Sequence, residues 1–136
     1  MFSYNFEKLE IWKLSLQAIK EVKKIVKKFP IEEKYILTDQ IRRAVLSIAL
    51  NIAEGFGRQS KKDFRRFISN AIGSVLEVIA CLKIAVDLNY LNEKEVKKFD
   101  ELLKELYFKL IKFSQNQTFE GLNSFFLVFF TATGIF

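Results

Sequence analysis

Apolar residues recur every three or four positions in four long stretches of this 136-residue chain. That spacing matches the 3.6 residues per turn of an α-helix, so each apolar set lies on one helix face. The stretches span residues 9–29, 38–54, 60–88 and 92–113. Before residue 118 we find no strand-like alternation, internal repeat or low-complexity linker. The pattern predicts an all-α fold, an antiparallel up-down four-helix bundle over residues 1–117.

Local signals set the ends of these helices. Pro30 cannot continue a helix, so the first helix ends there. Thr38 is the predicted N-cap of the second helix, and Gly55 is predicted to end it as a left-handed cap. The third and fourth helices begin at capping-box signals, namely Ser60 with Asp63 and Asn92 with Glu95.

The second and third helices carry more apolar residues than one bundle core can cover. On the second helix, Leu46 and Leu50 lie away from the main stripe. A second apolar series on the third helix consists of Ile72, Ile79 and Val86. Gly73, inside the third helix, costs about 1 kcal/mol relative to alanine, and we expect a second helix to approach closely there. The surplus apolar surface predicts contacts between subunits.

The composition excludes several kinds of chemistry. Histidine is absent and Cys81 is the only cysteine, which excludes histidine-based triads, disulfides within the chain and the usual zinc sites. Cys81 lies among apolar residues of a helical stretch, and we interpret it as a core residue. We expect no cofactor, no metal site and no enzymatic activity. The N-terminus lacks the basic and apolar regions of a signal peptide, which favours a cytoplasmic location.

A polar stripe crosses the second helix if that helix extends through Gly55. Its members are Arg43, Ser47, Asn51, Glu54 and Arg58. Burying such groups unpaired is costly, so they are either solvated or hydrogen-bonded to one another. We interpret the stripe as a structural network, in which Glu54 pairs with Arg58 or Arg43. A catalytic Glu54 or Asp63 is the alternative, but it needs a second tuned carboxylate that the sequence does not offer.

Nearly all the excess positive charge lies between residues 42 and 67. The chain has a net charge of +6, and this segment holds seven basic residues against two acids. A localised basic excess suits a polyanion such as nucleic acid. We predict a nucleic-acid-binding surface made of Arg42, Arg43, Arg58, Lys61, Lys62, Arg65 and Arg66.

Two alternatives to nucleic-acid binding stay open for this segment. The basic face is either simply solvated or paired with acids of a neighbouring chain. We expect Phe64 and Phe67 to turn away from the cations of the third helix. Phe56 either stacks on a base of single-stranded RNA or fills an apolar gap at the loop.

The C-terminal segment, residues 118–136, differs in character. It ends in FEGLNSFFLVFFTATGIF, which contains one acid, no base and six phenylalanines. It is too short and interrupted to span a bilayer as a helix, so no stable membrane insertion is expected. Three interpretations stay open: packing on the bundle or on a neighbouring subunit, a poorly ordered extension, or insertion into a membrane interface.

Residues 5–115 resemble a known family. The resemblance is carried by FEKLEIWKLSLQAIKEV, FPIEEKYILTDQIRRAVLSIALNIAEGFGR, SKKDFRRFISNAIGSVLEV and LNYL. These segments resemble the four-helix bundle proteins encoded in intervening sequences of the 23S ribosomal RNA gene. They are also similar to the accessory variability proteins of diversity-generating retroelements. Leu50 departs from the small residue that the family often has there, and the C-terminal segment lies outside the pattern.

The resemblance implies a bundle that assembles as a ring-shaped homo-oligomer, commonly a pentamer, with no enzymatic activity. For the retroelement relatives it implies binding of nucleic acid and of a reverse transcriptase through a basic surface. The leading hypothesis is therefore a non-enzymatic homo-oligomer that binds RNA or DNA. The alternative is a protein-interaction scaffold or accessory subunit that docks an acidic partner or a reverse transcriptase.

Overall fold

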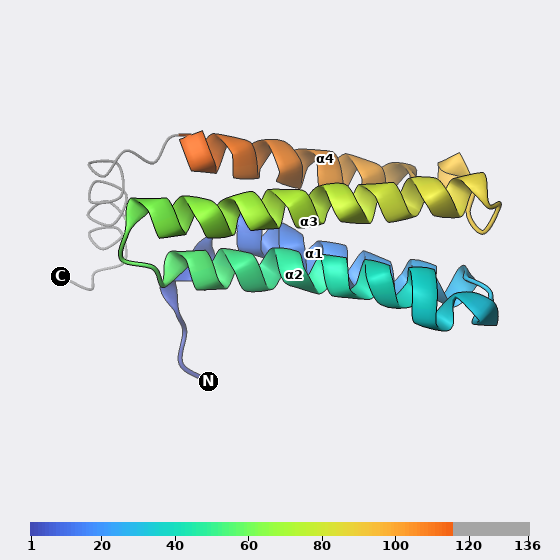
Figure 1. Cartoon of the computed structure of the whole chain (residues 1–136), viewed down its shortest axis with the longest axis horizontal. Helices are drawn as coiled ribbons and strands as arrows, with labels where there is room; N and C mark the ends of the chain where they lie inside the picture. Colours follow the sequence, from blue (N-terminus) through green and yellow to red (C-terminus); the bar gives the residue numbers. More distant parts are fainter. Residues whose placement is uncertain (116–136) are drawn as a thin grey trace.

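The structure is a computed structural model that describes residues 1–115. Its four α-helices are α1 (Glu10–Ile25), α2 (Asp39–Phe56), α3 (Lys61–Asp87) and α4 (Glu93–Gln115). They lie side by side along the long axis of the molecule (Figure 1). This arrangement confirms the predicted all-α four-helix fold. The C-terminal segment, residues 118–136, lies outside the described residues.

Successive helices pack against each other, and α1 also packs against α4. Ion pairs tie the first and last helices at both ends. Lys28, just after α1, pairs with Glu95 at the start of α4, and Glu10 at the start of α1 pairs with Lys109 near the end of α4. These two helices therefore run antiparallel, as an up-down bundle requires.

Short helical turns flank α1 and lead into α2. They are η1 (Asn5–Lys8), η2 (Val26–Lys28), η3 (Ile31–Glu33) and η4 (Lys34–Thr38). The first three are 3-10 turns and η4 is a π-helical turn. The helical path from α1 ends before Pro30, because Phe29 already has an extended backbone. The predicted stop at Pro30 is thus confirmed.

The bundle core contains the apolar stripes of the four helices. On α1 and its continuation the buried residues include Ile11, Leu14, Ala18, Val22, Ile25 and Phe29. On α3 they include Phe64, Ile68, Ala71, Val75, Val78, Leu82 and Ala85, and on α4 Phe99, Leu103, Leu106 and Leu110. Ser15 is also fully buried, and its hydroxyl donates to the Trp12 carbonyl at 2.6 Å. Hydrogen bonding within the helix satisfies this polar group, which apolar periodicity could not indicate.

The predicted N-cap of α2 is wrong. Thr38 has helical backbone angles, makes no capping hydrogen bond through its side chain and is buried. The π-helical turn η4 precedes α2 directly, so the helical path begins before Thr38. Glu33 caps that turn instead, because its carboxylate accepts the Leu37 amide at 3.3 Å.

The predicted left-handed cap at Gly55 is also wrong. Helix α2 continues through Gly55 to Phe56, and Gly57 is the C-cap with an ordinary φ of −83°. Gly55 is buried against α3, where a Cβ atom would lie 3.0 Å from the Cβ of Phe67. The glycine therefore permits a close approach of two helices rather than a turn.

The reverse holds for Gly73, where we expected a close approach. Apart from the adjacent residues and the backbone of its own helix, no heavy atom of the described residues lies within 4 Å of a Cβ built there, so that expectation is wrong for the single chain. The series Ile72, Ile79 and Val86 is partly buried against the core. A bundle core accommodates this series because an apolar helix stripe is wide. The exposed stripe of α3 runs instead through Leu76, Ala80, Ile84 and Leu88.

The starts of α3 and α4 follow the predicted capping signals. The Ser60 hydroxyl accepts the Asp63 amide at 3.1 Å. Asn92 and Glu95 form a reciprocal capping box. The Glu95 amide donates to the Asn92 side chain at 2.9 Å, and the Asn92 amide donates to the Glu95 carboxylate at 2.8 Å. Between α3 and α4, Asn89 adopts a φ of 60°, a left-handed conformation that asparagine tolerates after a helix.

Helix α3 is long and apolar enough to cross a bilayer, judged by length and composition alone. A helix in the core of a water-soluble bundle meets the same criterion. In this structure α3 contributes nine buried residues to the interior of the bundle.

Candidate nucleic-acid interface

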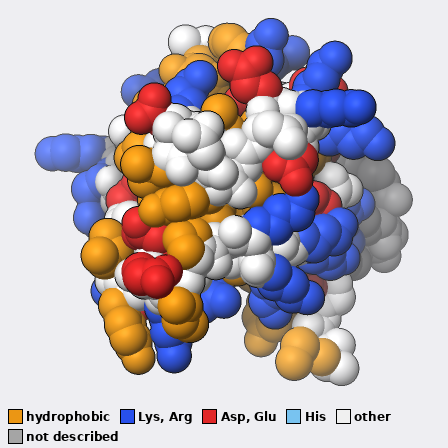
Figure 2. All heavy atoms as spheres, turned by 90° about the vertical axis from the view of Figure 1, so that its right-hand side faces the viewer, with side chains coloured by type: hydrophobic (Ala, Val, Ile, Leu, Met, Phe, Trp, Pro, Cys, Tyr) orange, Lys and Arg blue, Asp and Glu red, His pale blue; other side chains and the backbone are white. Residues whose placement is uncertain are grey.

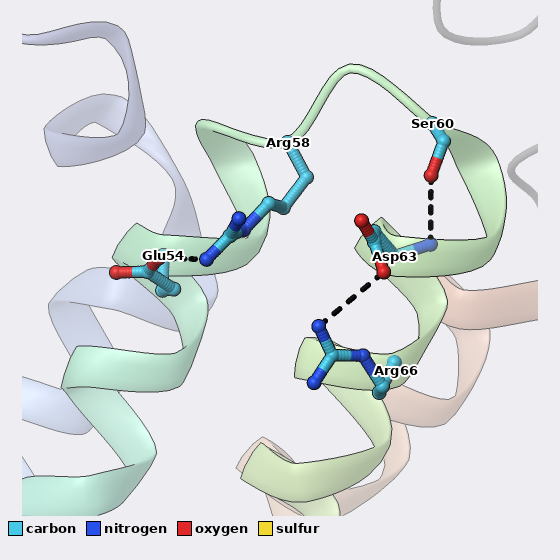
Figure 3. A network of polar contacts seen from close by, with 5 residues as sticks. All are labelled: Glu54, Arg58, Ser60, Asp63 and Arg66. Carbon is cyan, nitrogen blue, oxygen red and sulfur yellow. Dashed lines mark hydrogen bonds and ion pairs between the residues drawn. The ribbon is translucent and has the colours of Figure 1, made fainter.

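The connection between α2 and α3 determines where the predicted basic residues lie. Helix α2 ends at Phe56 and α3 begins at Lys61, so only residues 57–60 separate them. Gly57 donates to the Glu54 carbonyl at 3.1 Å, and Ser60 caps the next helix. This short turn brings Arg58 and the first two turns of α3 to one end of the bundle (Figure 3).

Five of the seven basic residues that were predicted to bind nucleic acid lie at this end. We call them the basic end: Arg58, Lys61, Lys62, Arg65 and Arg66. Arg42 and Arg43 are exposed but lie near the start of α2. At 1.5 Å rise per residue, about 20 Å of helix separates Arg43 from Arg58. The structure therefore does not bring the seven residues together on one surface.

Two arginines of the basic end form ion pairs with nearby carboxylates. Arg58 pairs with Glu54 one turn earlier on α2, which confirms one of the two predicted partners. Arg66 pairs with Asp63 at 3.3 Å (Figure 3). All four side chains are more than a third exposed. Such exposed pairs add little to stability, but they restrict the orientation of the arginine side chains.

The other three cations of the basic end have no such partner. Within residues 1–115, no carboxylate lies within ion-pair distance of Lys61, Lys62 or Arg65. Lys62 and Arg65 are exposed and Lys61 is partly exposed. Glu54 and Asp63 thus leave a local excess of three positive charges, which attracts polyanions.

The two paired arginines also contact one aromatic ring. The guanidinium carbon of Arg58 lies 4.6 Å from the centroid of Phe67, and that of Arg66 lies 4.5 Å from it. These are cation–π distances. Phe64 is buried, as expected, but the expectation that Phe67 turns away from the cations is wrong. Sequence spacing missed the Arg58 contact because Arg58 lies in the turn between α2 and α3, outside the helix that carries Phe67.

Phe56 is partly buried and packs against the core cluster. The structure therefore favours the interpretation in which it fills an apolar gap at the end of α2.

The middle of the polar stripe forms a structural network between α2 and α3. The Asn51 side-chain amide donates to the carbonyl and hydroxyl oxygens of Ser47 at 2.8 and 2.9 Å. Ser74 on α3 lies 2.9 Å from the Ser47 hydroxyl and 3.0 Å from the Asn70 carbonyl. Ser47 thus connects Asn51 to α3, and this part of the stripe is hydrogen-bonded as the structural-network interpretation predicts. The part played by Ser74 could not be predicted without the helix pairing.

Residues that could support catalysis or hold a metal do not converge in residues 1–115. No group of three or more Cys, Asp or Glu side chains there is placed to hold a metal ion. Glu54 and Asp63 are each paired with a different arginine. Cys81 is buried and unpaired with another cysteine, as predicted. Burial raises the pKa of its thiol, and the nearby Glu77 raises it further.

The opposite end of the bundle carries a different mixture of side chains. Figure 2 views this end and shows Lys and Arg side chains gathered toward one side and hydrophobic ones toward the other. The connection between α1 and α2 exposes Ile31, Tyr35 and Ile36. Lys28, in the turn after α1, is paired there with Glu95 of α4. This end therefore combines apolar surface with partly neutralised charge.

Comparisons with known proteins agree with this architecture. The family described as 23S rRNA-intervening sequence protein matches residues 7–112. The chain is also similar to a crystal structure of a protein of unknown function from the S23 ribosomal protein family of Bacteroides thetaiotaomicron. That match has 23% identity and a TM-score of 0.70, and it covers 76% of this chain and 97% of the other. At this identity the likeness shows the fold alone. No curated protein matches the chain.

Proposed function

This chain belongs to the 23S rRNA-intervening sequence protein family, and on that premise we propose that it is a non-enzymatic homo-oligomer that binds RNA or DNA. The basic end supplies the contacts with nucleic acid. Association of subunits repeats that surface within one particle, which raises a modest affinity per subunit through multivalency. We propose a ring of five subunits, as the family resemblance implies.

The observation that carries this proposal is the unbalanced charge of the basic end. Lys61, Lys62 and Arg65 have no carboxylate partner among the described residues. Cations that neutralise backbone phosphates release condensed counterions, which drives binding without reading the sequence. The proposed binding is therefore tolerant of sequence and sensitive to salt.

Exposed apolar side chains support self-association. Leu46 and Leu50 lie one turn apart on α2 and are about half exposed, at 49% and 57%. Leu76, Ile84 and Leu88 on α3 are exposed to a similar extent. Single exposed leucines are normal, but rows of them along two adjacent helices are typical of a contact surface.

The binding test neutralises the unpaired cations. We expect Lys61→Gln/Lys62→Gln/Arg65→Gln to weaken binding and to reduce the slope of log affinity against log salt by about 2 to 3, because each phosphate contact contributes about 0.7 to 0.9. Fluorescence anisotropy with labelled RNA and DNA at several salt concentrations measures both quantities. Lys23→Gln/Lys27→Gln/Lys104→Gln removes the same charge from exposed lysines elsewhere and is the matched control. Equal effects of the two triple variants would contradict the proposal.

The assembly test measures mass in solution. Light scattering of the wild-type chain at micromolar concentration should give a multiple of its 15.9 kDa mass. Leu46→Ser/Leu50→Ser should give smaller species with unchanged helix content. A compact wild-type monomer would overturn the assembly. A partner from cell lysate that stays bound after nuclease treatment would favour the docking of an acidic protein or a reverse transcriptase over nucleic acid.

A further inference from the structure

The contact between Phe67 and two arginines has a chemistry that phosphate neutralisation does not use. Arg58 lies in the turn that follows α2, and Arg66 lies in the second turn of α3. Both guanidinium groups lie over the Phe67 ring, at 4.6 and 4.5 Å. Phe67 is itself held in place, because its Cβ lies where α2 and α3 approach at Gly55. The ring therefore holds one planar cation from the α2–α3 turn and one from α3 in the same place.

Each of these arginines is held by two contacts. A terminal nitrogen of Arg58 pairs with Glu54, and a terminal nitrogen of Arg66 pairs with Asp63. The Phe67 ring and one carboxylate are the contacts that the structure gives each guanidinium group. The Arg58 side chain is 39% exposed and the Arg66 side chain is 58% exposed. Solvent, or a ligand, therefore has access to these groups.

The charges at the basic end divide into two kinds. Lys61, Lys62 and Arg65 are unpaired within the described residues and suit phosphates. Arg58 and Arg66 are partly neutralised by carboxylates, which weakens their attraction for a further anion. Their flat faces are not affected by that pairing. Nucleobases stack on arginine planes as well as on aromatic rings.

We propose that the Arg58–Phe67–Arg66 stack binds unpaired nucleobases, so that the ligand of the basic end is single-stranded nucleic acid. The backbone phosphates of the strand lie on the three unpaired cations, and its bases stack on the exposed guanidinium faces. Phe67 is a positioning residue that keeps the two planes in place. A duplex cannot use this site, because its bases are covered by their neighbours in the helix. This inference rests on the proposed function and narrows its substrate class.

The experiment compares four labelled probes with the full-length chain. They are a short single-stranded RNA, the DNA of the same sequence, the matching duplex, and a strand of the same length with abasic sites. Arg58→Lys/Arg66→Lys keeps both charges and removes both planes. Phe67→Leu removes the ring that positions the planes and keeps every charge. Phe108→Leu is the matched control, because Phe108 is an exposed phenylalanine on α4.

We expect the wild-type chain to bind the single strand more tightly than the duplex or the abasic strand. Arg58→Lys/Arg66→Lys should weaken single-strand binding about tenfold, which is within the range of base stacking on one or two residues. Its affinity for the duplex and abasic probes should stay within about twofold. Phe67→Leu should weaken single-strand binding in the same direction, and Phe108→Leu should not. Circular dichroism checks that each variant keeps its helix content.

Equal wild-type affinity for all four probes would overturn this inference and leave the proposed function standing. An equal loss for the duplex and the single strand in Arg58→Lys/Arg66→Lys would also overturn it, because that result indicates phosphate contacts. If no probe binds at low salt, the proposed function fails as well. Different affinities for the RNA and DNA strands would show which sugar the site prefers.

Discussion

Two glycines provide a direct test of the helix packing, since the same substitution should have opposite effects at the two positions. Gly55 lies inside α2, and an added Cβ would be 3.0 Å from Cβ of Phe67 and 3.5 Å from the Phe64 carbonyl oxygen. Gly73 lies inside α3, and an added Cβ would meet no atom of the described residues within 4 Å beyond the adjacent residues and the backbone of its own helix. Both residues are helical, so alanine gains the same intrinsic helix propensity at each.

The magnitudes follow from this geometry. Alanine in place of glycine inside a helix stabilises by about 1 kcal/mol, and Gly73→Ala should show that gain in full. At Gly55 the same gain is opposed by overpacking, which typically costs about 1 to 3 kcal/mol. The contacted Phe67 atom is attached directly to the α3 backbone, so it yields only if the helices separate. We therefore expect Gly55→Ala to destabilise the protein by about 1 kcal/mol.

Urea denaturation followed by circular dichroism measures both changes. The variants and the wild-type chain need the same protein concentration, because association of subunits contributes to apparent stability. The expected difference between the two variants is about 2 kcal/mol, with Gly73→Ala the more stable. Equal stabilisation of both would refute the close approach of α2 and α3 at Gly55. Destabilisation by Gly73→Ala would refute its open environment and indicate that another subunit covers it.

Two further predictions concern titratable groups. Hydrogen bonds from Lys28 and from the Asn92 amide lower the pKa of Glu95 in the folded protein. The Glu95 carboxylate therefore stabilises the fold above its unfolded-state pKa of about 4.3. That contribution is lost as the pH falls through its lower folded-state pKa. The urea midpoint of Glu95→Gln should therefore fall less than that of the wild type on acidification from about pH 6 to pH 3, and an identical fall would contradict this. Burial raises the pKa of the Cys81 thiol, so iodoacetamide should label the folded chain far more slowly than the urea-unfolded chain at neutral pH. Mass spectrometry measures this labelling, and equal rates would show that the thiol is accessible.

The helices themselves could be predicted because their apolar residues repeat with the helical period. On α3, all positions of the stripe that repeats every three or four residues are buried: Phe64, Ile68, Ala71, Val75, Val78, Leu82 and Ala85. The helix ends were predicted less well where one residue type has two uses. Glycine both ends helices and permits close packing, and the choice at Gly55 depends on Phe67, which is distant in sequence. Thr38 looks like an N-cap, but the helical path already begins with the π-helical turn η4, and Glu33 caps that turn.

The candidate site was predictable where it is local in sequence. Lys61, Lys62, Arg65 and Arg66 lie within two turns of one helix, so their proximity follows from spacing alone. The contact of Arg58 with Phe67 joins the α2–α3 turn to α3, and the bond between Ser47 and Ser74 joins α2 to α3. Such contacts depend on the register of α2 against α3, which apolar periodicity does not determine.

The pairing of the first and last described helices has a practical consequence for labelling this protein. Because Glu10 pairs with Lys109, the start of α1 and the end of α4 lie at the same end of the bundle. The α2–α3 turn lies at this end too (Figure 1). An affinity tag fused to the N-terminus would therefore lie close to the basic end and could block ligands there. A fluorophore is better attached at the far end through Glu32→Cys, an exposed site in η3. The native thiol is buried, so the dye would react selectively at the introduced position.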